Sequence, residues 1–95
     1  MGLDFEWDER KAKQNRKNHG VSFKEATTVF GDPLAVTIHD PLHSDDEDRF
    51  VTLGLSHRGW LLVVVTTDRA DRIRVISARL ATRREKKEHE EGEAK

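Results

Sequence analysis

Cysteine and tyrosine are absent from this chain of 95 residues, and proline occurs only twice. Without cysteine there is no disulfide framework and no thiolate nucleophile. Because a small secreted domain usually needs disulfides, we expect a cytoplasmic protein. The longest apolar run, residues 60–65, is far too short to cross a bilayer. The acidic N-terminal residues also lack the basic start of a signal peptide, so we do not expect a membrane or secreted protein.

Signatures of common catalytic sites are missing as well. The glycines are scattered singly, which excludes a glycine-rich phosphate loop, and no histidine or cysteine spacing is typical of a zinc site. The acidic run at residues 45–48 could attract a divalent cation, but it lacks the glycine turn of a calcium loop, which favours a solvated loop. We therefore expect no cofactor and no bound metal.

Aromatic residues make up only 6% of the chain. With two tryptophans and no tyrosine there is little material for base stacking, so sequence-specific reading of single strands is not expected. We expect Trp7 and Trp60 to pack in the core or at its edge rather than to bind bases.

Charged residues make up 37% of the chain, and their signs are segregated although the net charge is only −1. A basic block without acids spans residues 10–24, and a second spans residues 69–87, where Asp71 and Glu85 are the only acids. If the two blocks met in the fold, they would form a surface for a polyanion; the alternative is that they are solvated helix faces.

Hydrophobic periodicity predicts a strand and two helices in the first third of the chain. Residues 3–7 alternate apolar and acidic, as in a half-buried strand. Asp8 can cap a polar helix that ends near Gly20, a residue suited to a left-handed helix stop. Ser22 and Glu25 form a capping box that begins a second helix with an apolar face.

Four strands and a last helix are expected in the remainder. Alternating apolar residues and short turns across residues 34–79 indicate an antiparallel meander. Thr82 and Glu85 repeat the capping box, so a charged helix should run to about residue 91, before a frayed tail at 92–95. The predicted fold is α+β, in the order β-α-α-β-β-β-β-α. It is a small antiparallel sheet with helices packed on one face and the other face partly open.

The residue types present suit cleavage of RNA without a metal ion. That reaction needs a base for the 2′-hydroxyl, an acid for the leaving 5′-oxygen and cations for the phosphorane. Histidines titrate near neutral pH, and the planar fork of arginine matches phosphate oxygens. The five histidines are His19, His39, His43, His57 and His89. We expect His39, His43 and His57 to be exposed, and spacing alone does not assemble the others.

Two groups of residues allow a structural interpretation beside the functional one. Lys11, Asn15 and His19 share a helix face, but Asn15 could tie backbone groups together and His19 could simply favour the helix C-terminus. Strict alternation in the last strand places Arg79 with Ile73, Val75 and Ser77 and puts Arg74 on the other side. Arg79 would then bind phosphate, or form an ion pair with Glu85 or Asp32.

Two stretches resemble the signatures of a known family. Residues 5–26, FEWDERKAKQNRKNHGVSFKEA, resemble the N-terminal signature of the BrnT family, and residues 73–85, IRVISARLATRRE, resemble its second signature. The resemblance implies a RelE-like fold and a toxin of a type II toxin–antitoxin pair. Such toxins are ribonucleases that arrest translation and are neutralised by a ribbon-helix-helix antitoxin that also binds DNA. Two departures stand out: Asn18 replaces an expected lysine, and His89 replaces an expected tyrosine.

With this resemblance, we expect a single RelE-like toxin domain over residues 1–91. It would be a metal-independent endoribonuclease that cleaves mRNA to a 2′,3′-cyclic phosphate and inhibits translation. It would form a dimer, or a heterotetramer with its antitoxin. The residues expected to take part in catalysis are Arg79, His89, His19, Lys11 and Glu85. Those expected to bind RNA phosphates are Arg69, Arg74, Arg83 and Arg84. The alternative is a non-catalytic basic module that binds an acidic partner protein or nucleic acid.

Overall fold

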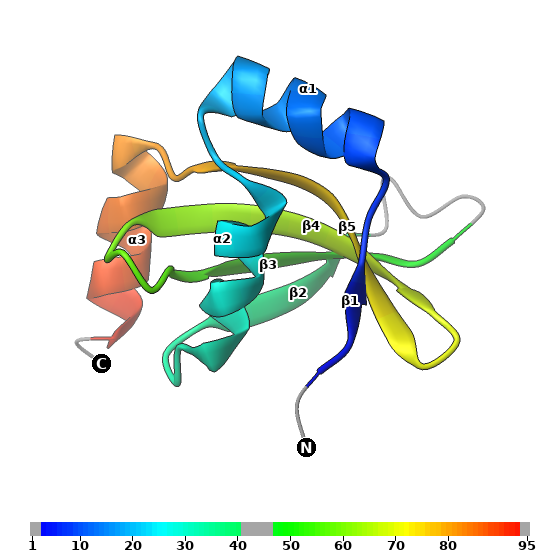
Figure 1. Cartoon of the computed structure of the whole chain (residues 1–95). Helices are drawn as coiled ribbons and strands as arrows, with labels where there is room; N and C mark the ends of the chain where they lie inside the picture. Colours follow the sequence, from blue (N-terminus) through cyan, green and yellow to red (C-terminus); the bar gives the residue numbers. More distant parts are fainter. Residues whose placement is uncertain (1–2, 41–46, 94–95) are drawn as a thin grey trace.

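The computed structural model describes residues 3–40 and 47–93 and shows one sheet with three helices (Figure 1). The elements, in chain order, are β1 (Phe5–Glu6), α1 (Glu9–His19), α2 (Phe23–Thr27), the 3-10 helix η1 (Thr28–Gly31), β2 (Val36–Asp40), β3 (Arg49–Leu55), β4 (Leu61–Arg69), β5 (Arg72–Leu80) and α3 (Arg83–Glu93). The predicted α+β class and the order β-α-α-β-β-β-β-α are confirmed. Within the described residues no helix is long and apolar enough to span a membrane.

The five strands form one sheet in the order β1-β5-β4-β3-β2. Strands β2 to β5 pair antiparallel, as the meander predicts, whereas the short β1 pairs parallel to β5, with Phe5 opposite Ile73. The sheet is therefore mixed rather than wholly antiparallel. No turn joins β1 to β5, so nothing in the local sequence fixes their relative direction.

The predicted caps fix the ends of the helices. The Asp8 carboxylate accepts the backbone N–H of Arg10 at 2.8 Å, and Gly20 ends α1 in the left-handed region with φ 69°. At α3 the capping box is complete, because Thr82 Oγ1 accepts from Glu85 N and Glu85 Oε1 accepts from Thr82 N. Helix α3 runs to Glu93, two residues beyond the predicted end.

Helices α1 and α2 cover one face of the sheet, and the core lies between these helices and the sheet (Figure 1). Its buried residues are Val21, Phe23, Ala26, Val29, Leu62, Val64, Val75 and Ala78. Asn15 is buried and ties α1 to β5, since its Nδ2 donates to Ala78 O at 2.8 Å and its Oδ1 accepts from Ala78 N at 3.1 Å. Asn15 thus satisfies backbone groups that burial would leave without water.

A β-bulge in β5 changes which side chains share a face. Val65 pairs with Ser77, but the next residue, Thr66, pairs with Val75, so Ile76 is the extra residue. The prediction from strict alternation was therefore wrong. Val75 faces the helices, while Arg74 and Arg79 both point to the opposite face. The sequence did not reveal this arrangement, because a bulge does not show in the apolar pattern.

Candidate active site

An ion pair between Arg79 and Glu85 lies on the open face, near the end of β5. Arg79 Nη1 donates to Glu85 Oε1 at 2.8 Å and Nη2 donates to Oε2 at 2.9 Å, so the pair is bidentate. Arg79 Nη1 also donates to Leu80 O at 3.2 Å, which bends the guanidinium along β5 toward the end of the strand. Of the two partners weighed for Arg79 from sequence, the structure selects Glu85 rather than Asp32.

This ion pair fixes the charge of both groups. The hydrogen bonds from Arg79 lower the pKa of Glu85 to about 2, with help from the backbone N–H of Thr82. The same contact raises the pKa of Arg79. The Arg79 and Glu85 side chains keep 41% and 32% of their surface exposed, so a ligand can still reach the guanidinium. At neutral pH, Glu85 is therefore a carboxylate that holds Arg79 and has no proton to donate.

An apolar groove of about 710 Å³ lies beside the ion pair, between α3 and the open face of β2 and β3. Its floor is formed by Val36, Ile38, Val51, Leu53 and Val63, and the α3 side by Glu85, Glu88, His89 and Gly92. The half-buried His89 lies one helical turn after Glu85. The structure thus places His89 in the same groove as Glu85, the partner of Arg79.

Asp32 lies near His89, directly before the groove residue Pro33. Its carboxylate accepts the backbone N–H of Leu55 at 2.8 Å and of Leu34 at 2.9 Å. These hydrogen bonds lower the pKa of Asp32, and the charge of His89 contributes to the same shift. Because both Asp32 oxygens already accept backbone hydrogen bonds, Asp32 supplies a fixed negative charge beside the imidazole.

A row of polar residues crosses the open face away from the groove. The cross-strand partners, in order, are Asp40, Arg49, Thr67, Arg74 and Glu6. Arg74 Nη1 donates to Glu6 at 3.0 Å, and the buried Thr67 donates to Asp48 O at 2.6 Å. Arg49 was not singled out from the sequence, because only strand register shows that it faces the same side as Arg74.

The remaining predicted site residues are more scattered. Arg69 is exposed at the end of β4, 3.9 Å from Glu47, and Arg84 donates to Glu88 on the exposed side of α3. Lys11 and His19 are exposed on α1, which covers the face of the sheet opposite to the Arg79 side chain (Figure 1). The structure therefore does not bring Lys11 or His19 to the Arg79–Glu85 pair.

The described residues hold no group of three or more histidine, aspartate or glutamate side chains arranged around a common metal position. Residues 45 and 46 of the acidic run, and His43, lie outside the described part of the chain.

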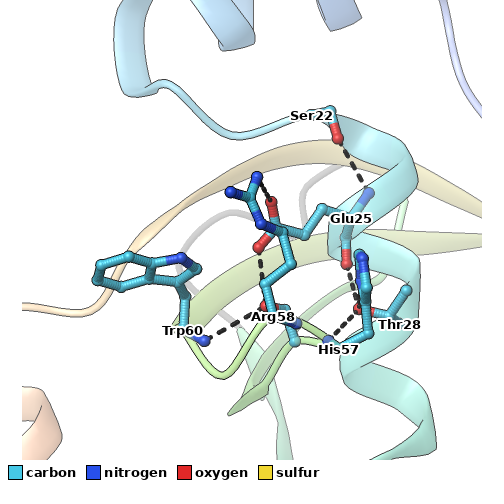
Figure 2. A network of polar contacts seen from close by, with 7 residues as sticks. Ser22, Glu25, Thr28, His57, Arg58 and Trp60 are labelled. Carbon is cyan, nitrogen blue, oxygen red and sulfur yellow. Dashed lines mark hydrogen bonds and ion pairs between the residues drawn. The ribbon is translucent and has the colours of Figure 1, made fainter.

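A second polar network joins α2 to the turn between β3 and β4 (Figure 2). Ser56 Oγ donates to the buried carboxylate of Glu25 at 2.7 Å, and His57 N donates to Thr28 Oγ1 at 2.9 Å. Arg58 Nη1 lies 3.9 Å from Glu25 Oε1. The Ser22–Glu25 pattern predicts that Glu25 takes part in a capping box at the start of α2. Ser22 Oγ does accept Glu25 N, but the Glu25 carboxylate reaches across to the turn and fixes it.

Comparison with known proteins agrees with the two signatures seen in the sequence. A family described as "Ribonuclease toxin, BrnT, of type II toxin-antitoxin system" matches residues 7–85. The chain belongs to the BrnT family. The crystal structure of the Brucella abortus ribonuclease toxin BrnT is similar, with a TM-score of 0.64 and 20% identity, over 86% of this chain and all of that one. At this identity the likeness shows a shared fold. No curated protein sequence matches the chain.

Membership of the BrnT family confirms the coarse functional prediction. The chain is a ribonuclease toxin of a type II toxin–antitoxin system, so its partners are an RNA substrate and an antitoxin. The matched residues include Arg79 and Glu85, whereas His89 lies beyond them. The contribution of His89 therefore has to be argued from the groove itself.

Proposed function

We propose that this BrnT toxin cleaves mRNA without a metal ion, by attack of a ribose 2′-oxygen on the adjacent phosphorus. The attack forms a 2′,3′-cyclic phosphate while the 2′-hydroxyl proton passes to solvent water, and it breaks the bond to the 5′-oxygen, which takes up a proton. The observation that carries the proposal is the position of Arg79, which lies on the same face as Arg74 and is held by Glu85, a residue that lines the same groove as His89.

Arg79 stabilises the phosphorane in this mechanism. The transition state carries extra negative charge on the phosphoryl oxygens, and preorganised cations aimed at that charge lower the barrier. Glu85 acts as a positioning residue, because a carboxylate with a pKa of about 2 is a weak base and stays unprotonated near neutral pH. Arg74 and Arg49 extend the positive charge along the open face, where further phosphates of the strand would lie.

His89 is the residue proposed to donate the proton to the leaving oxygen. It lines the groove on the same helix as Glu85, and the negative charge of Asp32 lies near it. His19, the other histidine considered, is separated from Arg79 by the sheet. Lys11 is also on that far side, so we assign it to the exposed basic surface of α1.

The proposed antitoxin is a ribbon-helix-helix protein that forms a heterotetramer with two toxin chains in the cytoplasm. Its site on the toxin should overlap the groove, since filling the space beside Glu85 and His89 would deny RNA access to Arg79. Val36 and Ile38 support this arrangement, because each leaves more than half of its surface exposed on the groove floor, at 52% and 60%.

Cleavage of an end-labelled mRNA fragment by the purified chain tests the proposal. The wild type should release fragments that end in a cyclic phosphate, and the Arg79→Ala variant should not. Arg72→Ala is the matched control, because Arg72 is an exposed arginine at the other end of β5. Binding without cleavage by the wild type would instead support the alternative, a non-catalytic basic module.

A further inference from the structure

We infer that Trp60 forms a stacking subsite for a nucleobase of the RNA, at the same end of the sheet as Arg79. The inference rests on the proposed function and adds a binding site to it. Trp60 is 52% exposed, and within the described residues its indole makes no hydrogen bond and no aromatic ring contact. The expectation that Trp60 packs in the core or at its edge does not account for so large an exposed aromatic surface.

Trp7 provides an internal comparison. Its ring packs edge-on against Phe23 with a centroid distance of 6.2 Å, and its Nε1 donates to Glu9 at 3.1 Å. Trp7 is half-buried beside the core, as expected. The two tryptophans therefore differ: one stabilises the fold, and the other presents a ring to solvent.

The turn that carries Trp60 is held rigidly. Ser56 N donates to Trp60 O at 2.8 Å, and Gly59 N donates to Ser56 O at 2.9 Å. Gly59 has φ +83°, a conformation that glycine adopts without strain. The turn is anchored through Ser56 Oγ to the buried Glu25, and Figure 2 shows the indole extending away from this network. A platform that is already ordered loses little entropy when a base stacks on it.

Backbone contacts place Trp60 at the same end of the sheet as the Arg79–Glu85 pair. Ala81 N donates to Leu61 O at 2.9 Å, which continues the antiparallel pairing and sets Trp60 opposite Thr82. Thr82 N in turn donates to the Glu85 carboxylate that holds Arg79. By strand alternation Trp60 lies on the side of Leu62, which α1 and α2 cover, whereas Arg79 lies on the open face, so an RNA strand bound at both residues would pass around this end of the sheet.

The charges around Trp60 favour a nucleic acid as the occupant. Arg58 lies on the same turn with 65% of its side chain exposed, and Arg83 and Arg84 are exposed just after Thr82. An aromatic platform beside cations is the arrangement that binds single-stranded nucleic acid, because every base has a π-face and every linkage has a phosphate. Leu80, 47% exposed, adds apolar surface at this end of the sheet.

Intrinsic fluorescence separates the two tryptophans. The probe is a single-stranded oligonucleotide with 2′-O-methyl riboses, which binds but has no 2′-hydroxyl to attack phosphorus. It should quench the fluorescence of the wild type and of Trp7→Phe, in which Trp60 is the one remaining tryptophan. It should leave Trp60→Phe, in which only Trp7 emits, almost unquenched.

Affinity measurements give a second readout. Trp60→Ala should weaken binding of the same oligonucleotide about 5- to 100-fold, the loss expected for one base–aromatic stack, and Trp60→Phe should retain most of the affinity. The slope of log affinity against log salt should not change in Trp60→Ala, because no phosphate contact is removed. In Arg58→Ala the slope should fall in magnitude by about 0.7.

The outcomes distinguish this inference from the proposed function. Suppose that the wild type cleaves RNA, that Trp60→Ala has the same affinity, kcat and KM, and that the oligonucleotide does not quench the wild type or Trp7→Phe. The stacking subsite is then overturned, and the proposed function stands. If Trp60→Ala loses antitoxin binding but keeps RNA binding, Trp60 belongs to the protein interface and the subsite is again overturned. A wild type that neither binds nor cleaves RNA overturns both.

Discussion

Arg74 and Arg79 point to the same face of the sheet although they are five residues apart in one strand. In a regular strand, an odd separation places two side chains on opposite faces. The bulge at Ile76 removes one step of the alternation, so both guanidinium groups face away from α1 and α2. A single extra residue therefore turns two separate arginines into parts of one surface.

Replacing Arg79 should abolish most of the cleavage. We expect Arg79→Ala to lower kcat about 100- to 1000-fold, as for the loss of one preorganised donor to a developing anion. Arg79→Lys should recover little, because an ammonium cannot reproduce the bidentate contact with Glu85. Initial rates on a labelled RNA, with Arg72→Ala as the control, measure this; a rate near that of wild type in Arg79→Ala would remove Arg79 from the mechanism.

The Arg79–Glu85 pair should make stability depend on pH in the acid range. The pKa of Glu85 falls from its ordinary 4.5 to about 2 in the folded state, so its stabilisation is present above pH 4.5 and is lost as the pH falls toward 2. Glu85→Gln keeps an acceptor for Thr82 N but lacks the charge. Allowing for solvent screening of a partly exposed pair, it should be less stable than wild type by about 1–2 kcal/mol at pH 7.

Urea unfolding of the wild type and Glu85→Gln at pH 7, 4.5 and 2.5 checks the sign as well as the size of this effect. The difference in the free energy of unfolding should persist from pH 7 to about pH 5 and then narrow. A difference that stayed constant down to pH 2.5 would mean that the Glu85 charge contributes nothing.

His89 should give the cleavage rate a pH dependence near neutrality. An imidazolium acid loses its proton within about pH 5 to 8, so the rate should fall as the pH rises through this range. In His89→Tyr the profile should be flat there, because a phenol stays protonated. The profiles of wild type, His89→Tyr and His89→Ala decide the matter: if His89→Ala keeps the full rate and the same profile, His19 becomes the next candidate.

Cleavage should persist when divalent ions are removed. The mechanism proposed here uses Arg79 and His89 where other nucleases use a cation, so EDTA should leave the rate within about twofold. The same reaction with added magnesium is the comparison. Activity that vanished in EDTA and returned with magnesium would contradict the proposal and direct attention to the acidic residues 45–48.

The apolar floor of the groove should be needed for the antitoxin but not for chemistry. A charge on its apolar floor, as in Ile38→Asp, should weaken the toxin–antitoxin complex at least tenfold, while cleavage by the free toxin is unchanged. Leu3→Asp is a matched control, since Leu3 is a similarly exposed aliphatic residue outside the groove, 57% against 60% for Ile38. Titration calorimetry with the purified antitoxin measures the affinity of Ile38→Asp and of Leu3→Asp. If the two variants bind the antitoxin equally well, the antitoxin binds outside the groove.

The parts of this fold that could be predicted from the sequence are those set by local chemistry. Asp8, Gly20 and the Thr82–Glu85 box each fix a helix end through contacts within a few residues, and each was found where the sequence placed it. The two family signatures likewise lie in continuous stretches, and the family match covers them.

The parts that could not be predicted depend on distant pairing. The bulge at Ile76 is defined only against β4, so the apolar pattern of β5 alone misplaced Arg74. Arg49 joins the open face through a register that no single strand reveals. Glu25 has the sequence of a cap, yet its carboxylate is bound by Ser56, which lies 31 residues away. Whether a tryptophan is exposed depends on what packs over it, and the sequence did not show this for Trp60.

The parallel pairing of β1 with β5 also bears on when the toxin can act during its own synthesis. Residues near the start of the chain, Phe5 and Asn15, are held by Ile73 and Ala78, and Val75 and Ala78 complete the core beneath the helices. A nascent chain cannot close this core until β5 has left the ribosome, because the early residues have nothing to dock against. The surface that carries Arg74 and Arg79 therefore forms only after β5 has emerged from the ribosome.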